Sequence, residues 1–132
     1  SASRVKFIFD DLKPVGDSLL LARKDKRWQL ISAINNKVLL DEITDWYQAD
    51  APERIIIKKS GRFGLLGNTA GIIKPTVYQE ILWWTEGQTI LFMGILPVNE
   101  HVNTCEYFTI SGKLLRSFNI EKSKTELIIC DN

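Results

Sequence analysis

The stretch whose residue types could do chemistry runs from Glu100 to Glu106 and holds the single histidine, His101, and one of the two cysteines, Cys105. A Cys–His pair can form a thiolate nucleophile when the imidazole lies within hydrogen-bond reach of the thiol. His101 with Glu100 or Glu106 could instead bind a metal ion. Because the stretch has no Gly-rich oxyanion turn and no third orienting group, we interpret it as a polar loop before a strand whose first inward residue is Cys105. We therefore predict that the protein is not an enzyme and uses no cofactor or metal.

Carboxylates cluster in three places, and two carboxylates across a cleft would be the requirement for a glycosidase. The clusters are Asp10-Asp11, Asp41-Glu42 with Asp45, and Asp50 with Glu53. Because these acids fall in the links between apolar runs, we interpret them as solvated turns. The phosphate-binding strings GxxxxGK[ST] and GxGxxG are missing from the sequence, which excludes nucleotide binding by those routes.

Basic residues gather in two short stretches and are the better candidates for a binding surface. They are Arg23, Lys24, Arg27, Lys58, Lys59 and Arg62. We predict that they bind an acidic surface of another protein, although lysines on exposed hairpin edges also discourage aggregation. The net charge of +1 argues against a dedicated nucleic-acid binder, so we do not expect nucleic acid as the partner.

Two pairs of adjacent aromatic residues, Trp46-Tyr47 and Trp83-Trp84, lie in apolar runs. Neighbours in a strand point to opposite faces, so only one member of each pair enters a core readily. We predict that an exposed member of one pair joins the basic residues at the partner-binding surface, because exposed aromatic residues are frequent interface hot spots. The alternative is that neighbouring layers cover both faces.

Length and composition bound the class of protein. A chain of 132 residues with 45% hydrophobic and 25% charged residues fits one globular domain over residues 1–132. No apolar run approaches the ~18 residues that span a bilayer. Since no charged-then-apolar leader opens the sequence, we expect a cytoplasmic protein and leave export open. Cys105 and Cys130 fit reduced, buried thiols better than a disulfide.

Short runs rich in Ile, Val, Leu and aromatic residues recur every eight to twelve positions and predict an all-β fold. A short helical turn at Glu42–Tyr47 or Tyr78–Leu82 is the exception that we consider. Ser60-Gly61 and Ser111-Gly112 predict tight hairpin turns, where glycine supplies a positive φ. The expected strands are Val5–Phe9, Ser18–Lys24, Arg27–Ser32, Lys37–Asp41, Arg54–Lys59, Arg62–Gly67, Gly71–Lys74, Ile81–Thr85, Thr89–Ile95, Glu106–Ser111, Lys113–Phe118 and Thr125–Cys130.

An internal repeat of 35 residues organises these strands, since the sequence from Leu20 matches that from Ile55 without a gap. A third, eroded copy begins near Thr89, and Phe9–Leu12 resembles the tail of a preceding unit. We predict serial antiparallel β-hairpin repeats in about three units, approximately 18–47, 53–82 and 88–118, sharing one continuous core. The stacking can be propeller-like or solenoid-like. The predicted core residues are Leu20, Trp28, Leu30, Ile55, Phe63, Leu65, Tyr78, Phe92 and Phe108.

The second unit, KKSGRFGLLGNTAGIIKPTVYQEI, resembles the WG repeat, a β-hairpin repeat found mostly in bacterial proteins. The matching positions are Gly61, Arg62, Phe63-Gly64, Leu65-Leu66, Gly71, Ile73 to Pro75 and Tyr78 to Glu80. The first unit keeps Trp28 but has Gln29 and Leu40 where the pattern has glycine and proline. The resemblance implies a β-rich module that is not known for catalysis and is presumed to bind other molecules.

We therefore expect a non-enzymatic protein-binding β-repeat module. A scaffold within a larger assembly is one form of this function. The alternative is a small immunity protein that neutralises a bacterial toxin by direct binding, which small size and the missing catalytic set support. The near-neutral net charge argues against mimicry of nucleic acid, which would need an acidic surface.

Overall fold

A computed structural model describes residues 8–49, 54–67 and 71–125 and confirms the all-β class, with twelve strands in three four-stranded antiparallel sheets. The first sheet contains β1 (Asp11–Val15), β2 (Leu19–Lys24), β3 (Arg27–Ser32) and β4 (Val38–Ile43). The second contains β5 (Asp45–Gln48), β6 (Arg54–Lys59), β7 (Arg62–Gly67) and β8 (Gly71–Tyr78). The third contains β9 (Glu80–Glu86), β10 (Thr89–Pro97), β11 (Val102–Thr109) and β12 (Leu114–Glu121).

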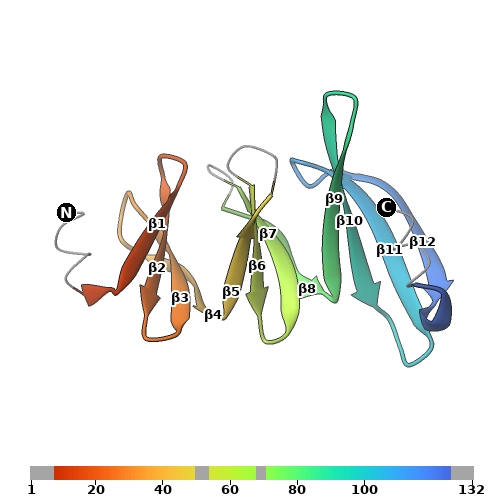
Figure 1. The fold of residues 1–132 in the computed structure, drawn as a ribbon, viewed down its shortest axis with the longest axis horizontal. Helices are drawn as coiled ribbons and strands as arrows, with labels where there is room; N and C mark the ends of the chain where they lie inside the picture. Colours follow the sequence, from red (N-terminus) through yellow and green to blue (C-terminus); the bar gives the residue numbers. More distant parts are fainter. Residues whose placement is uncertain (1–7, 50–53, 68–70, 126–132) are drawn as a thin grey trace.

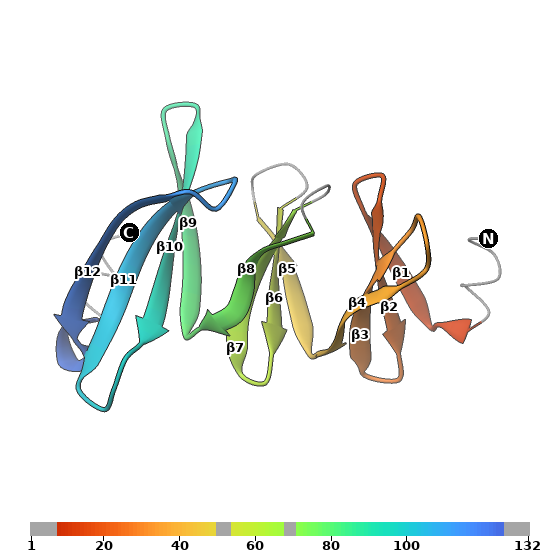
Figure 2. The ribbon, with the colours of Figure 1, turned by 180° about the vertical axis from the view of Figure 1, so that it is seen from behind.

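Each sheet is a meander in which the strands lie in chain order, so the serial hairpins predicted from the repeat are confirmed. Thr44 alone links the first sheet to the second, and Gln79 alone links the second to the third. Both expected helical turns, Glu42–Tyr47 and Tyr78–Leu82, are therefore wrong, because strand continues on either side of a one-residue link. The three sheets stand side by side in an open row that does not close into a barrel (Figures 1 and 2).

The sheets begin one strand earlier than the sequence units did. β1 and β5 were missed by the strand pattern because their sequences, DLKPV and DWYQ, are short and largely polar. Leu12 therefore belongs to the first strand of the first sheet and not to the tail of a preceding unit. The expected strands Val5–Phe9 and Thr125–Cys130 lie mostly outside the described residues, and their described members are not in strands.

The buried side chains form three clusters, so the prediction of one continuous core is wrong. The first cluster joins the first two sheets and is aliphatic, with Leu21 and Leu30 facing Ile55 and Ile57. A second cluster joins the second and third sheets and combines four aliphatic with three aromatic residues; we call it the aromatic layer. It contains Ala49, Ile56, Leu65, Tyr78, Ile81, Phe92 and Phe108. The third lies on the other face of the third sheet around Met93, Ile95 and Cys105. The second and third sheets thus each separate two apolar clusters, because successive residues of a strand point to opposite faces.

Six of the nine predicted core residues are buried, namely Leu30, Ile55, Leu65, Tyr78, Phe92 and Phe108. The other three are half-buried. Leu20 lies between the buried Leu19 and Leu21 and points to the opposite face of β2. Trp28 and Phe63 stand next to the hairpin turns, at the ends of β3 and β7, where the layers are open to solvent.

Gly64 shows why the second unit pairs glycine with proline. A Cβ on Gly64 would lie 2.7 Å from the carbonyl oxygen of Lys74 and 2.9 Å from the carbonyl carbon of Pro75, so β8 approaches β7 closely at this point. A glycine beside the aromatic residue permits this close approach, because it has no side chain to clash with the neighbouring strand. The first sheet has Gln29 at the equivalent position, and its fourth strand instead takes a positive φ of 55° at Glu42.

Candidate functional site

The β2–β3 and β6–β7 turns lie at the same end of neighbouring sheets (Figure 1), which brings the six predicted basic residues to one edge of the molecule. We call these six residues the hairpin row. Within it, register pairs Arg23 with Trp28 and Lys58 with Phe63, directly across each hairpin. The Arg23 guanidinium lies 5.9 Å from the Trp28 ring centroid, and the Lys58 ammonium lies 5.3 Å from that of Phe63. Each hairpin therefore holds a cation over an aromatic face.

Carboxylates from β4 interrupt the hairpin row. Lys59 Nζ lies 3.3 Å from Asp41 Oδ1, and Arg27 Nε lies 3.5 Å from Glu42 Oε2. Both acids belong to a cluster that we interpreted as solvated turns, and they are exposed strand residues instead. The row is therefore a surface of mixed charge. The sequence alone does not show this, because it does not tell which hairpins the carboxylates of β4 lie beside.

Among the described residues, Arg27 and Lys59 are the members of the row that form ion pairs, and Arg23 and Lys58 lie over aromatic rings. The remaining members, Lys24 and Arg62, have neither kind of contact within the described ranges, and both are exposed. They stand at the turn-proximal ends of β2 and β7. Of the row, these two cations are the ones most available to an approaching acidic partner.

Of the first aromatic pair, Tyr47 is the exposed member. Trp46 packs edge-on against Trp28 at 5.4 Å in the layer between the first two sheets. Tyr47 is 45% exposed and tilts over Phe63 at 6.4 Å. Its hydroxyl donates to Asp45 Oδ2 at 2.8 Å, and this hydrogen bond is the main cause of a raised pKa for Tyr47. Tyr47 thus places an amphipathic ring beside the aromatic residue of the second hairpin.

The second aromatic pair lies away from the hairpin row. Trp83 packs against the aromatic layer, and Trp84 meets Tyr107 edge-on at 5.6 Å on the other face of the third sheet. The two side chains point to opposite faces as predicted, and both are half-buried. The layer between the second and third sheets covers Trp83, whereas Trp84 is partly covered by Tyr107 of its own sheet.

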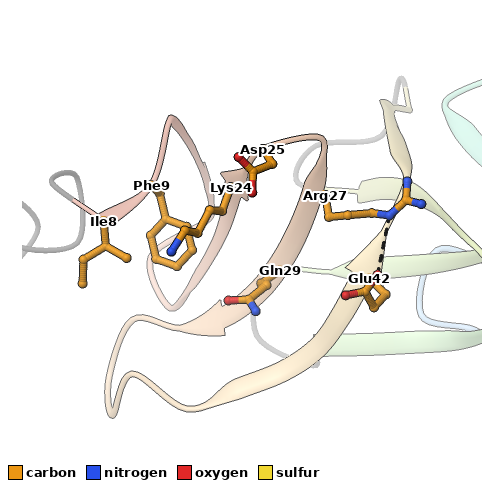
Figure 3. Close-up of a pocket in the computed structure, with 7 residues that line it drawn as sticks. All are labelled: Ile8, Phe9, Lys24, Asp25, Arg27, Gln29 and Glu42. Atoms are coloured by element: carbon orange, nitrogen blue, oxygen red, sulfur yellow. Dashed lines mark ion pairs between the residues drawn. The ribbon is translucent and has the colours of Figure 1, made fainter.

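A surface hollow of about 410 Å³ borders the hairpin row at the first sheet. Figure 3 shows the Arg27–Glu42 ion pair on one side of this hollow and the Lys24 side chain beside the Phe9 ring on the other. Its remaining lining residues are Ile8, Asp25 and Gln29, which supply no thiol or imidazole. The hollow gives the row a concave part in which a polar side chain of a partner could lie.

The residues with catalytic potential are kept apart. Cys105 is a free thiol that is fully buried, and burial raises its pKa. His101 is exposed and lines a different hollow with Glu100 and Glu121, which Cys105 does not reach. Glu106 accepts a hydrogen bond of 2.6 Å from the Tyr78 hydroxyl. In the part of the chain that the structure describes, no three His, Cys, Asp or Glu side chains gather as metal ligands would.

Cys105 is a free, buried thiol, as predicted, whereas Cys130 lies outside the described residues. No helix among the described residues has the length and apolar character needed to cross a membrane.

No protein-family model, curated protein or solved structure matches this chain. The resemblance to the WG repeat therefore stands on the residues of the two hairpin units alone.

Proposed function

We propose that this chain is a non-enzymatic protein-binding module of the WG-repeat kind, and that its partner binds the hairpin row together with Tyr47. The observation that carries the proposal is the repeated cation-over-aromatic pair, Arg23 on Trp28 and Lys58 on Phe63, at matching register in two neighbouring sheets. The repetition gives a binding surface with a fixed spacing set by the stacked sheets.

The residue types at this edge suit a protein partner. Aromatic residues and arginine are enriched in protein interfaces and dominate their hot spots. Tyr47 supplies a ring that stands ready on the surface, while Lys24 and Arg62 supply cations that attract an acidic partner over a distance. We propose that the ring anchors the complex and that the cations speed its formation.

A small inhibitor of a bacterial toxin remains the alternative proposal, and it uses the same surface. The two proposals differ in the partner: an inhibitor binds one toxin domain and abolishes its activity, whereas a scaffold binds a component of a larger assembly. A toxin gene next to the gene for this chain would favour the inhibitor.

Capture of the partner from the native host, with identification by mass spectrometry, provides the ligand for the decisive experiment. Association kinetics are then compared for the unchanged chain, for Lys24→Glu/Arg62→Glu and for Tyr47→Ala. The charge reversal is expected to slow association and to flatten its dependence on salt, because it removes electrostatic attraction. Tyr47→Ala is expected to speed dissociation by about tenfold or more if the ring is a hot spot.

Lys37→Glu/Lys113→Glu is the matched control, because it makes the same change in charge at residues outside the hairpin row. All variants replace exposed side chains and should keep the circular dichroism spectrum and melting temperature of the unchanged chain. If Lys24→Glu/Arg62→Glu binds the captured partner at an unchanged rate and with an unchanged salt response, the hairpin row is not the binding surface.

A further inference from the structure

A second surface lies along the fourth strands of the three sheets. Among the described residues, eight of the eleven large hydrophobic side chains that are exposed lie on β4, β8 and β12 or on the turns that precede β4 and β12. These eight are Ile34, Val38, Leu39, Ile72, Val77, Ile110, Leu114 and Leu115. We call this surface the fourth-strand edge. Such a concentration of exposed aliphatic side chains marks an interaction surface.

The aliphatic residues repeat at equivalent positions. Register places Val38 opposite Ile31, Ile72 opposite Leu66, and Leu114 opposite Phe108. The three outward residues are 51%, 41% and 48% exposed, in the same order. Because sheet order is the same in all three units, β4, β8 and β12 lie on one side of the molecule (Figure 2). Each of the three sheets therefore has an exposed aliphatic residue at the equivalent position of its fourth strand.

The same stretches carry cations and no carboxylates. Residues 32–40, 71–79 and 109–118 contain no Asp or Glu, although the whole chain has 16 acidic residues. Their basic residues are Lys37, Lys74, Lys113 and Arg116. Lys37 and Lys113 follow the exposed Ile34 and Ile110 in equivalent turns. A backbone hydrogen bond closes each turn: the Ser32 N–H donates to the Lys37 carbonyl, and the Thr109 N–H donates to the Lys113 carbonyl. The acidic residues of these strands, Asp41, Glu42 and Glu121, lie toward the ends of β4 and β12, outside these stretches. In its turn-proximal part, the fourth-strand edge therefore combines exposed aliphatic groups with positive charge.

Contacts between sheets hold part of this edge in one piece. The Nε of Arg54 in the second sheet donates a 2.8 Å hydrogen bond to the carbonyl of Ile110 in the β11–β12 turn. Gly112 of that turn packs so closely on Ile73 of β8 that a Cβ would lie 2.7 Å from its side chain. The Lys74 ammonium lies 4.8 Å from the Phe108 ring centroid and spans the same junction. The edges of the second and third sheets thus form a continuous surface.

The composition of the edge favours a lipid surface over a protein. Lysine is depleted in protein interfaces, and leucine and valine are under-represented among their hot spots. Three of the four cations here are lysines, and the exposed hydrophobic residues are all aliphatic. A second copy of the chain is disfavoured, because a two-fold contact through this edge would bring the cations of both copies together.

We propose that the fourth-strand edge binds the surface of a membrane that contains anionic lipids. The exposed cations Lys37, Lys113 and Arg116 attract the negatively charged headgroups. The aliphatic tips led by Ile34, which is 82% exposed, enter the boundary between headgroups and acyl chains. The binding is peripheral and reversible. This membrane binding does not depend on the protein partner proposed above, because that partner binds the hairpin row at the β2–β3 and β6–β7 turns.

Sedimentation with lipid vesicles tests the proposal on the intact chain. The chain is expected to sediment with phosphatidylcholine vesicles that contain phosphatidylserine, to be released by high salt, and to remain in solution with phosphatidylcholine alone. Lys37→Glu/Lys113→Glu should weaken the binding at least about tenfold, since each basic residue near an anionic surface contributes about 1 kcal/mol. Ile34→Ser/Leu114→Ser should also weaken the binding at low salt, because it removes part of the apolar contribution.

Lys24→Glu/Arg62→Glu is the matched control for net charge, since both double reversals take the formal net charge from +1 to −3. The proposal requires that this control keeps most of the vesicle binding. It is overturned if the unchanged chain does not sediment with the anionic vesicles, or if both double reversals lose binding equally. It is also overturned if Lys37→Glu/Lys113→Glu binds vesicles normally but aggregates, because the lysines would then only protect the strand edges from pairing.

Discussion

The two edges of the molecule each present a row of cations, but they surround those cations differently. In the hairpin row, Lys59 and Arg27 contact carboxylates, while Arg23 and Lys58 lie over aromatic rings. Along the fourth-strand edge, Lys74 and Arg116 also lie over aromatic rings, but the exposed side chains around the cations are aliphatic, and residues 32–40, 71–79 and 109–118 contain no carboxylate. The difference indicates that one repeated fold presents two surfaces of distinct chemistry.

The two edges also depend on different parts of the stack. The hairpin row belongs to the first and second sheets, and its two rings pack against different clusters: Trp28 against the first and Phe63 against the second. The fourth-strand edge extends over all three sheets and therefore needs the aromatic layer that fixes the third sheet. A change in the third-sheet side of this layer should therefore affect the fourth-strand edge more than the hairpin row, and the first prediction below uses this property.

The largest effect is expected from Gly94→Ala, which should break the fourth-strand edge and spare the hairpin row. A Cβ on Gly94 would lie 2.5 Å from the Tyr78 ring, so the ring or β10 must move. We expect the free energy of unfolding to fall by about 1–3 kcal/mol, measured by urea denaturation. Vesicle binding should fall with it, while partner binding at the hairpin row persists.

Ser117→Ala is the control for Gly94→Ala, because Ser117 is an exposed residue on β12. An unchanged unfolding free energy in Gly94→Ala would show that the third sheet does not need this close approach.

A smaller loss is expected from Tyr78→Phe, which removes the hydrogen bond that joins the second sheet to Glu106 of the third. The half-buried carboxylate loses its donor, which should cost about 1–2 kcal/mol at pH 7 by denaturant titration. Tyr47→Phe removes a similar bond to Asp45 at an exposed site, so it should cost less.

The effect of Tyr78→Phe should also depend on pH. Burial, and then the hydrogen bond to Glu106, raise the pKa of Tyr78 above its ordinary value of 10.0. Above about pH 10 the unfolded chain therefore loses this proton while the folded chain keeps it, and stability falls by up to about 1.4 kcal/mol for each pH unit. The variant lacks this contribution, so the gap between the two proteins should narrow as pH rises beyond 10. A constant gap would contradict the raised pKa.

The smallest effect is expected for the ion pair between Lys59 and Asp41. A double-mutant cycle with Lys59→Ala and Asp41→Ala should give a coupling of about 0.2–1 kcal/mol at low salt that vanishes at high salt, because the pair is solvent-exposed. Lys113→Ala, at the other edge, should leave stability unchanged. A coupling well above 1 kcal/mol would mean that the hairpin row is a structural network and not a surface open to a partner.

The repeat predicted much of the fold, since it is encoded locally. Ser60-Gly61 and the alternation of apolar residues specify the β6–β7 hairpin, and the offset of 35 residues places the β2–β3 hairpin in the same position of the first sheet. The boundaries of the sheets could not be read in this way. β1 and β5 have only five and four residues, too few to show a clear alternation, and a one-residue link such as Thr44 leaves no turn signal.

The candidate site was predicted only in part, for a related reason. The sequence identified the cations of the hairpin row, whereas the carboxylates of β4 that contact them depend on strand pairing. Tyr47 could not be selected from its pair because exposure depends on the neighbouring sheet. The fourth-strand edge did leave a signal in the sequence, namely three stretches with basic and aliphatic residues but no acids, yet only the topology shows that they lie on one side.

Hydrogen–deuterium exchange with and without phosphatidylserine-containing vesicles tests most directly the central claim that the two edges are separate binding surfaces. The amides expected to exchange fastest are those of the edge strands, because these strands lack a hydrogen-bonded neighbour on one side. We predict slower exchange in residues 33–40, 71–78 and 109–116 when vesicles are present, with no change in residues 23–28 and 58–63. Protection of residues 23–28 and 58–63, or equal protection at both edges, would contradict the claim.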